Sequence, residues 1–235
     1  MIRLETLRKT YSNGRGVRDI ALELGPGIHG IIGPNGAGKT TVMKLVMGLL
    51  RPDEGRILVG GVDVWKESDG HSWRRGMGYL PAEDYFYGFL SGRRNLEYIA
   101  LLKTGNRQAV DAIGDALEHL GVRDFWEDGF SSYSTGMKKK IQIAASLIGD
   151  PETLVWDEPN NGVDLIGNIF LRDLLEGFRA AGKTVMLSSH VIEFLEGLLD
   201  SLTVLAEGRI VLHAEPAPSD LRSAFLGALE RGGER

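Results

Sequence analysis

The residues Gly33-Pro34-Asn35-Gly36-Ala37-Gly38-Lys39-Thr40 decide how this chain folds. They match the pattern G-x-x-x-x-G-K-[ST], which forms a phosphate-binding loop when it follows a strand and opens a helix. The short apolar stretch 28–32 before it is typical of a buried strand, and residues 40–50 after it repeat apolar side chains at helical spacing. The sequence therefore predicts a strand, a glycine-rich loop and a helix, in that order.

The glycines of this loop explain how it can bind an anion. Glycine adopts backbone conformations that other residues avoid, so successive N–H groups converge on one anion, and the dipole of the following helix adds a favourable field. Lys39 can bridge phosphate oxygens, the Thr40 hydroxyl can ligate Mg²⁺, and Thr41 can add a hydrogen bond. A glycine-rich turn with a chance Lys-Thr pair is the alternative, and the flanking strand and helix argue against it. The candidate nucleotide-binding residues here are Gly33, Asn35, Gly36, Ala37, Gly38, Lys39, Thr40 and Thr41.

A second candidate site lies much further along the chain. Residues 153–158 read Thr-Leu-Val-Trp-Asp-Glu, so an apolar strand ends in two carboxylates. Because strand side chains alternate in direction, the two acids should face different partners. Asp157 is the candidate ligand or second-sphere partner of Mg²⁺, and Glu158 is the candidate to polarise or deprotonate an attacking water. Such a pair alone is usually a solvated turn, but together with the upstream loop it indicates a hydrolytic site.

The composition is that of an ordinary globular protein. The 235 residues, 43% hydrophobic and 25% charged, allow one large domain or two small ones and exclude wholesale disorder. The net charge of −5 argues against a generally basic nucleic-acid binder, and the absence of cysteine excludes disulfides and thiolate chemistry. No apolar run approaches the roughly 20 residues of a membrane-spanning helix, and residues 1–12 show no secretory signal. We therefore expect a protein that works inside the cell.

Strand-like and helix-like segments alternate along most of the chain, which predicts an α/β fold with a parallel sheet. Residues 56–64, around Gly60-Gly61, predict a hairpin, and helical spacing dominates from 84 to 148. Further strands are predicted at 153–156, 184–188 and 202–205, and helices at 95–102, 109–120, 166–181 and, from the spacing of Leu221, Phe225 and Leu229, in the tail. We expect a core lobe formed by residues 1–81 and 151–213, an inserted helical subdomain at 82–150 and a short tail at 214–235.

Further motifs follow in a fixed order. Tyr133-Ser134-Thr135-Gly136-Met137 precedes Asp150-Pro151 and the acidic strand, Asn161-Gly162-Val163-Asp164 follows that strand, Ser188-Ser189-His190 follows the next strand, and Tyr11 stands 22 residues before Gly33. With these motifs the chain resembles, over about residues 2–213, the ATP-binding subunit (nucleotide-binding domain) of an ABC transporter. The loop and the acidic strand would be its Walker A and Walker B motifs. The resemblance implies a P-loop NTPase core with a parallel sheet, an antiparallel β subdomain and an inserted helical subdomain.

The resemblance also implies a role for each motif. Tyr11 would stack on adenine, His190 would sense the γ-phosphate beside the catalytic Glu158 and Lys39, and Asp164 would belong to the D-loop. In this family the signature loop of one subunit covers the ATP held by another, so ATP and Mg²⁺ are the implied cofactors and a head-to-tail dimer is implied, with a second copy or a close relative. The signature residues acting on the second subunit's ATP would be Ser134, Thr135, Gly136 and Met137.

The implied partner is a separate integral-membrane permease, which would place this chain peripherally on the cytoplasmic face of the cell membrane, with no nucleic acid involved. The stretch Ser91-Gly92-Arg93-Arg94-Asn95-Leu96 resembles the ABC-2 type subfamilies of exporters, so export is the favoured direction. The transported substrate cannot be inferred, because it would contact the other polypeptide.

The sequence departs from the family pattern in several places. Ala82 stands where the family usually has a glutamine, and its methyl group can neither ligate a cation nor accept a hydrogen bond, so Glu83, the backbone or water remain as substitutes. Thr135 and Met137 replace a usual glycine and glutamine of the signature. The run 138–140 places three lysines in the first turn of a predicted helix, where the dipole disfavours them, and forms either a solvated face or an attraction for the partner's triphosphate.

Four aromatic residues between positions 85 and 89 have two interpretations. They belong either to the core of the helical subdomain or to a groove that receives a helix of the permease. Two alternatives to a transporter subunit also stay open: a soluble ABC ATPase without a transport role, and a regulatory nucleotide-binding module with little turnover, which Ala82 and the altered signature would suit. A P-loop kinase or GTPase is disfavoured because no N-K-x-D string occurs in the sequence.

Overall fold

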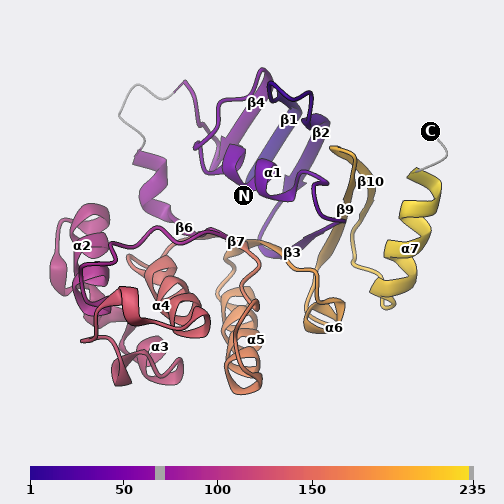
Figure 1. The fold of residues 1–235 in the computed structure, drawn as a ribbon. Coiled ribbons are helices and arrows are strands. Elements are labelled where there is room, and N and C mark those ends of the chain that lie inside the picture. Colours follow the sequence, from indigo (N-terminus) through magenta and orange to yellow (C-terminus); the bar gives the residue numbers. More distant parts are fainter. Residues whose placement is uncertain (67–71, 233–235) are drawn as a thin grey trace.

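The computed structural model describes residues 1–66 and 72–232, which form two sheets with helices packed on them (Figure 1). The larger sheet has the strand order β10-β9-β3-β8-β7-β6, in which β10 is antiparallel to β9 and the other neighbours are parallel. The smaller sheet is antiparallel, in the order β2-β1-β4-β5. The predicted α/β fold, with a parallel and an antiparallel sheet, is confirmed.

The elements have the following bounds. The strands are β1 (Ile2–Thr10), β2 (Gly16–Leu24), β3 (Gly27–Ile32), β4 (Glu54–Val59), β5 (Val62–Asp63), β6 (Met77–Leu80), β7 (Thr153–Asp157), β8 (Thr184–Ser188), β9 (Ser201–Ala206) and β10 (Arg209–Ala214). The α-helices are α1 (Lys39–Val46), α2 (Gly92–Thr104), α3 (Gly114–His119), α4 (Thr135–Leu147), α5 (Leu165–Ala180), α6 (Ile192–Leu195) and α7 (Leu221–Gly232). The 3₁₀ helices are η1 (Ser72–Gly76), η2 (Arg107–Ile113), η3 (Val122–Asp124) and η4 (Phe130–Ser132).

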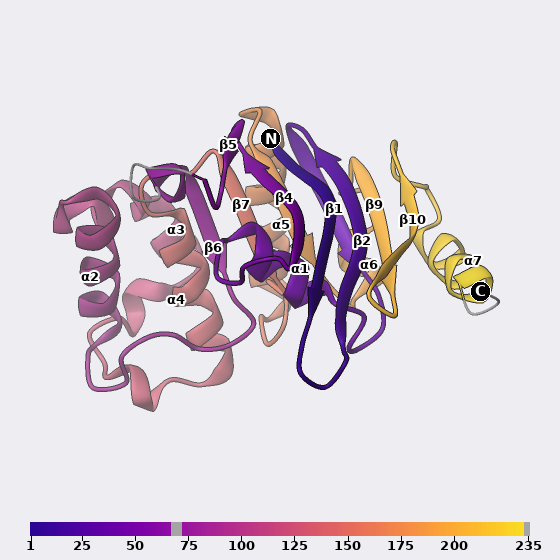
Figure 2. The same ribbon diagram turned by 90° about the horizontal axis from the view of Figure 1, so that it is seen from above.

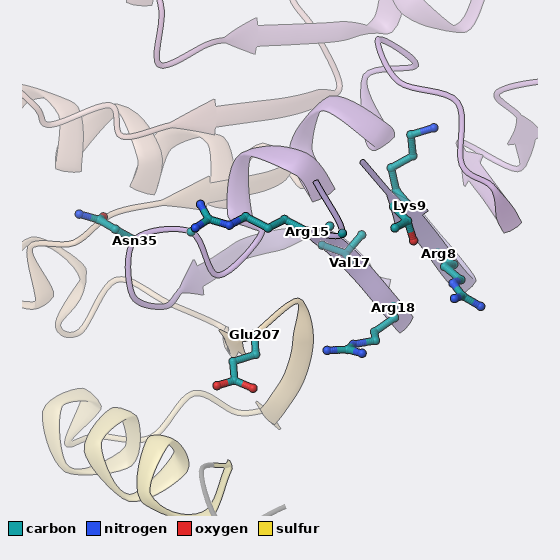
Figure 3. A pocket seen from close by; sticks show the side chains of 11 residues that line it. Arg8, Lys9, Arg15, Val17, Arg18, Asn35 and Glu207 are labelled. Carbon is teal, nitrogen blue, oxygen red and sulfur yellow. The ribbon is translucent and has the colours of Figure 1, made fainter. Parts of the chain in front are cut away.

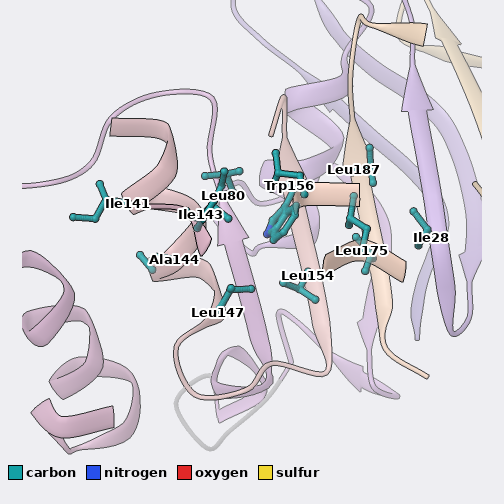
Figure 4. Close-up of a cluster of buried hydrophobic side chains, with 14 of the residues drawn as sticks. Ile28, Leu80, Ile141, Ile143, Ala144, Leu147, Leu154, Trp156, Leu175 and Leu187 are labelled. Carbon is teal, nitrogen blue, oxygen red and sulfur yellow. The ribbon is translucent and has the colours of Figure 1, made fainter. Parts of the chain in front are cut away.

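The central strands β3, β7 and β8 are buried along their whole length. Successive side chains point to opposite faces of the sheet, so one strand serves two hydrophobic cores. Leu154 and Trp156 belong to the core that α4 and α5 cover (Figure 4), whereas Val155 belongs to the core beneath α1 and the small sheet. The indole N–H of Trp156 donates to the Ser146 hydroxyl at 3.0 Å, so its one polar group is satisfied.

The segment between β6 and β7 is helical, as predicted, and its helices α2, α3 and α4 gather beyond the β6 edge of the sheet (Figures 1 and 2). The helix α2 begins at its N-cap Ser91 and ends at Gly105. The single helix predicted over 109–120 is wrong, because the chain forms η2 and then the short α3. The Asn106 side chain accepts a hydrogen bond from Gln108 N, which starts a tight turn, and Gly114 interrupts the stretch as a poor helix former.

The small sheet contains β1 and β2, two strands that the sequence pattern did not predict. Their alternation is broken where Thr6 and Asp19 adopt φ angles of 48° and 55°, and the pairing of β1 with β2 shifts register between Leu4 and Leu7. The extra residue of a bulge moves the following side chains to the other face of the sheet. A pattern search for strict alternation therefore misses both strands.

The tail forms helix α7, where the sequence predicted helical spacing. Its Leu221 and Ala228 are buried in the same core as β9, and Figure 2 shows the helix lying beside β10 at the end of the molecule. Within residues 1–66 and 72–232, no helix combines the length and the apolarity needed to cross a membrane.

Candidate nucleotide-binding site

The phosphate-binding loop joins β3 to α1, and its shape depends on glycine. Gly36 and Gly38 adopt φ angles of 79° and 106°, in the region that residues with a side chain rarely enter. A Cβ on Gly33 would lie 2.2 Å from the Leu205 carbonyl oxygen, so the loop also packs too closely for a side chain there. The Lys39 ammonium donates to the carbonyl oxygens of Gly33 at 2.6 Å and Pro34 at 3.2 Å, which holds its positive charge over the loop.

Asp157, at the end of β7, is 1% exposed and accepts a hydrogen bond on each carboxylate oxygen. The Thr40 hydroxyl donates to Oδ2 at 2.7 Å, and the Ser188 hydroxyl donates to Oδ1 at 2.6 Å. The parallel pairing of β7 with β8 places Ser188 directly beside Asp157. A threonine hydroxyl and a carboxylate are hard oxygen donors of the kind that Mg²⁺ prefers, so this donor set fits that cation.

Glu158 follows directly and faces a different partner. Its Oε2 accepts hydrogen bonds from the His190 backbone N–H at 3.2 Å and from His190 Nδ1 at 2.7 Å. The Glu158 backbone has a φ of 54°, and its N–H donates to the Ser188 hydroxyl at 3.0 Å. A strained backbone of this kind persists where the surrounding contacts fix it, as Ser188 and His190 do here.

The loop and the two carboxylates line one cavity of about 420 Å³, a volume in the usual range of small-molecule sites. Tyr11 also lines it, is 37% exposed, and has its hydroxyl oxygen 3.4 Å from Thr41 Oγ1. His190 is not among the residues that line the cavity, but it contacts Glu158, which does line it. The structure thus brings together residues that lie far apart in the sequence: Tyr11, Asn35, Gly36, Ala37, Gly38, Lys39, Thr40, Thr41, Ala82, Asp157 and Glu158.

A second cavity, of about 430 Å³, adjoins the first and shares Arg15, Gly16, Asn35 and Gly36 with it (Figure 3). Arg8, Lys9 and Arg18 add further positive charge, and Glu207 is the acidic residue of the lining. These residues could not be identified from the sequence, because their charges come from β1, β2 and the β9–β10 turn and meet only in the fold. Their combined field favours the approach of a polyphosphate.

The signature residues lie outside the cavity, at the start of α4. Ser134 caps this helix, its hydroxyl accepting from the Met137 backbone N–H at 3.3 Å. Gly136 packs so closely that an added Cβ would lie 2.7 Å from the Gly162 carbonyl oxygen, and a Cβ added to Gly162 would lie 3.3 Å from Thr135 Cγ2. Within the described part of the chain, none of residues 134–137 lines the 420 Å³ cavity. These residues therefore present a face of the subunit that is separate from its own loop.

The lysine run 138–140 does not form a solvated face, so that interpretation is wrong. Lys138 Nζ donates to Asp84 Oδ2 at 2.9 Å, Lys139 is 6% exposed, and Lys140 Nζ donates to Asp164 Oδ2 at 2.8 Å. Asp164 also caps α5 by accepting from the Gly167 N–H at 2.7 Å. The hydrogen bonds from Lys140 and then from Gly167 lower the pKa of Asp164, so its carboxylate stays charged.

The departures from the family pattern are placed as follows. The Ala82 methyl lines the nucleotide cavity, whereas the Glu83 side chain is 84% exposed and lies 3.8 Å from Lys44 Nζ. The aromatic run is divided: Phe86 packs on Phe130 with ring centroids 5.0 Å apart, but Phe89 is 84% exposed. Tyr85 and Tyr87 are exposed as well. The run therefore serves both the core and the surface.

Comparison with known proteins identifies the family. The family profile described as "ABC transporter" matches residues 17–161. The chain is 32% identical to the "ABC transporter ATP-binding protein NatA" of Bacillus subtilis (strain 168), over 93% of this chain and 92% of that protein. It is 34% identical to the "Daunorubicin resistance ATP-binding protein DrrA3" of Streptomyces coeruleorubidus, over 100% and 72%. It is 36% identical to the "Bacitracin transport ATP-binding protein BcrA" of Enterococcus faecalis, over 90% and 68%.

Solved structures show the same fold. An ATP-binding subunit of an ABC transporter covers 100% of both chains with a TM-score of 0.86 at 24% identity. A dimeric ATP-binding cassette in a post-hydrolysis state, bound to ADP and Pi, covers 93% of this chain and 100% of that one with a TM-score of 0.80 at 21% identity. Profile, relatives and fold agree, and the chain belongs to the ABC transporter family as one of its ATP-binding, ATP-hydrolysing subunits.

Proposed function

We propose that this protein drives export by hydrolysing ATP on the cytoplasmic face of the membrane, in complex with a separate membrane-spanning permease. The observation that supports it best is that Lys39, Asp157 and Glu158 meet at the carboxyl ends of β3 and β7, around one cavity. The names of two relatives, which refer to daunorubicin resistance and bacitracin transport, favour export as the direction. The transported substrate would contact the permease.

The site residues divide into groups by their contacts. The backbone N–H groups of residues 35–38 and the Lys39 ammonium would hold the phosphates, and the Tyr11 ring would lie against the base. Thr40 and Asp157, which already share a hydrogen bond at 2.7 Å, would hold Mg²⁺. Bound there, Mg²⁺ supplies charge neutralisation of the phosphate oxygens.

Glu158 is the proposed general base. It is the one carboxylate at the end of β7 whose oxygens are not taken up by hydroxyl donors, and His190 fixes its orientation through two hydrogen bonds. From this position Glu158 can accept a proton from a water, while His190 keeps the Glu158 side chain in place. Ser188 ties both acids to β8, since it donates to Asp157 and accepts from the Glu158 N–H.

The nucleotide would be enclosed only when two subunits meet. The signature residues 134–137 lie outside their own subunit's cavity, and Ser134 already offers a capped helix N-terminus, which favours an anion. We therefore propose a head-to-tail dimer in which residues 134–137 of each copy cover the ATP of the other. ATP binding would close the dimer and hydrolysis would open it.

The substitution Glu158→Gln tests this function. It preserves the shape of the side chain but removes the base, so the turnover number should fall about 100-fold or more while ATP still binds. Size-exclusion chromatography with ATP should then show a trapped dimer, and the wild type should return to monomer as ATP is consumed. Glu176→Gln, on the exposed side of α5, is the matched control and should hydrolyse ATP normally. A Glu158→Gln protein that stays monomeric with ATP bound would contradict the proposed dimer.

An apolar cavity of about 440 Å³ is the proposed docking site of the permease. It is lined by residues from α1 and the turn after it, from β6 and the loop after it, and from α2 and α4, among them Leu49, Met77, Tyr85 and Ile99. The exposed Tyr87 and Phe89 adjoin its loop and suit the binding of a short helix in a groove. The double variant Tyr85→Ser and Tyr87→Ser should lose transport in membrane vesicles that also contain the permease. ATP binding by the isolated chain should persist, and intact transport would contradict this docking site.

A further inference from the structure

The apolar cavity of about 440 Å³ in which the permease is proposed to dock has four charged residues in its lining. We call it the docking cavity. Two of the four balance each other, because Lys44 Nζ lies 3.8 Å from Glu83 Oε1. The other two are Asp84, in the loop after β6, and Lys103, near the end of α2. Whether these two have partners inside the chain decides what charge a docked segment must bring.

Asp84 is fully engaged by side chains of α4. Its Oδ2 accepts from Lys138 Nζ at 2.9 Å, and its Oδ1 accepts from Gln142 Nε2 at 2.9 Å. Gln142 is 1% exposed, so packing fixes its amide as well as this bond does. The charge of Asp84 is therefore balanced within the chain and is not left for a docked segment.

Lys103 has no such partner. Its ammonium forms no hydrogen bond or ion pair with another residue of the ranges 1–66 and 72–232, although the side chain lines the docking cavity. A Cβ added to Gly149 would lie 3.5 Å from Lys103 Cε, so the lysine stem packs against the turn after α4. Burial lowers the pKa of Lys103 to about 8, and the positive charge of Lys183 acts in the same direction. A carboxylate beside this ammonium would stabilise its charged form.

The wall of the docking cavity also contains a hydroxyl without a partner. Tyr79, on β6, lines the cavity, and its hydroxyl oxygen is buried with no hydrogen-bond partner in the described part of the chain. A buried polar group in this state costs stability, so it calls for an explanation. The two unmet groups of the lining, the Lys103 ammonium and the Tyr79 hydroxyl, can both donate a hydrogen bond.

An apolar segment that filled the docking cavity would remove Lys103 from water, and a buried ammonium without a counter-ion is costly. We propose that the permease segment that docks here carries a carboxylate, which pairs with Lys103, and that the docked segment also accepts a hydrogen bond from Tyr79. A segment with a positive charge at this point would be repelled, so the pair also selects the partner. This inference rests on the proposed docking function of the cavity.

Charge reversal at Lys103 tests the proposal with the full chain and the permease purified in detergent. The affinity of Lys103→Glu for the permease should fall about 100-fold or more, because two carboxylates would face each other, and that of Lys103→Met about tenfold. The melting temperature of Lys103→Met alone should not fall, since an unpaired charge is removed. Arg231→Glu is the matched control, because Arg231 is exposed on α7, at the opposite end of the molecule from α2 (Figure 2).

A compensating exchange in the permease would identify the carboxylate. Each aspartate and glutamate of its cytoplasmic segments is replaced by lysine in turn, and binding to Lys103→Glu is measured. One exchange should restore the affinity for Lys103→Glu and weaken binding to the wild-type chain. A normal affinity in Lys103→Glu would overturn the proposal, and so would the failure of every exchange to restore it.

The hydroxyl has its own test, which does not depend on the folding of Lys103 variants. Tyr79→Phe keeps the ring and removes only the unpaired group, so the melting temperature of the chain should not fall. The affinity for the permease should fall about threefold, because the docked segment loses a donor. An unchanged affinity would overturn the hydrogen bond from Tyr79.

Failure of the docking site itself would give a different result. If the double variant Tyr85→Ser and Tyr87→Ser transports normally, the cavity does not receive the permease, and the proposed docking site fails. If that double variant loses transport while Lys103→Glu binds the permease with normal affinity, the docking site stands and only the carboxylate partner of Lys103 is rejected.

Discussion

The two-sheet part of the molecule and the helical segment between β6 and β7 hold their functional groups in different ways. In the sheets, Asp157 is 1% exposed and both of its oxygens are bound by hydroxyls. In the helical segment, Phe89 is 84% exposed and Leu102 is 68% exposed. Fixed polar groups suit the chemical step, and exposed apolar area suits the binding of a partner. The difference teaches that chemistry and coupling are built in separate parts, which meet where α4 contacts Asp84 and Asp164.

Truncation of one tryptophan in each part should give the largest difference between the two parts, measured as the loss in the free energy of unfolding. Trp156→Ala removes a fully buried ring that stacks edge-on with Phe178 and bonds Ser146, so the free energy of unfolding should fall by about 3–5 kcal/mol. Trp126→Ala removes a half-buried ring in the helical segment, between Arg93 and Arg123, and should cost about 1 kcal/mol. Denaturant unfolding measures both losses. Equal losses would contradict the contrast between the two parts.

Removal of the loop lysine should affect the site without affecting the fold. Lys39→Ala deletes the charge held over the phosphate-binding loop, so the affinity for ATP should fall about 100-fold, or roughly 2.7 kcal/mol. Titration with a fluorescent ATP analogue measures the affinity, and circular dichroism checks the fold. Lys44→Ala, on the same helix but paired with Glu83, is the control. If Lys39→Ala binds ATP with normal affinity, the phosphates do not bind at this loop.

A glycine substitution should separate packing in the helical segment from ATP binding. A Cβ at Gly92 would lie 2.3 Å from the Tyr133 hydroxyl and 2.4 Å from Ile141 Cδ1, and Tyr133 is fixed by a 2.7 Å bond to the Phe125 carbonyl. Gly92→Ala should therefore cost about 1–3 kcal/mol of stability, measured by thermal unfolding, with ATP affinity unchanged. Gly177→Ala in α5 is the control. The added Cβ would have no atom within 4 Å, and alanine favours the helix, so the free energy of unfolding should rise by about 0.5–1 kcal/mol.

The smallest expected effect is a change with pH in the stability of the two-sheet part. His29 in β3 is buried, its Nε2–H donating to the Gly25 carbonyl at 2.9 Å and its Nδ1 accepting from the Ser201 hydroxyl at 2.8 Å. Burial lowers the pKa of His29 in the folded protein, so the unfolded chain binds the proton more readily. The contribution of the neutral His29 side chain to the free energy of unfolding is complete above the pKa of about 6.5 that histidine has in the unfolded chain. This contribution is lost as the pH falls toward the lower pKa of His29 in the folded protein.

The melting temperature should accordingly be lower at about pH 5 than at about pH 7.5, and the difference should shrink in His29→Gln. His119→Gln, on the exposed side of α3, should keep the full difference. If the melting temperature of His29→Gln depends on pH as it does in the wild type, groups other than His29 cause the effect.

Much of the fold could be predicted because the central strands are locally encoded. Ile28–Ile32, Thr153–Trp156 and Thr184–Ser188 are short apolar runs bounded by turn residues, and all three form buried strands. The strands β1 and β2 could not be predicted, because Thr6 and Asp19 break their alternation and only the paired sheet compensates for it.

The candidate site shows the same division. The glycine-rich loop and the acidic strand end are contiguous in sequence, so the residues of both could be named in advance. Ser188 and Gln142 could not, since each acquires its partner through tertiary contact: Ser188 through the register of β8 with β7, and Gln142 through the packing of α4 on the loop after β6. A serine at a strand end and a glutamine inside a helix are too common to stand out by type alone.

The Trp156 indole also gives the protein an intrinsic fluorescent probe. It sits on the reverse side of the strand that carries Asp157, and its single hydrogen bond goes to Ser146 on α4. Any tilt of α4 relative to β7 during the ATP cycle must stretch or break that bond and change the polarity around the ring. Emission from this fluorophore, recorded with Trp65, Trp73 and Trp126 replaced by phenylalanine, would follow the motion in real time without an attached dye.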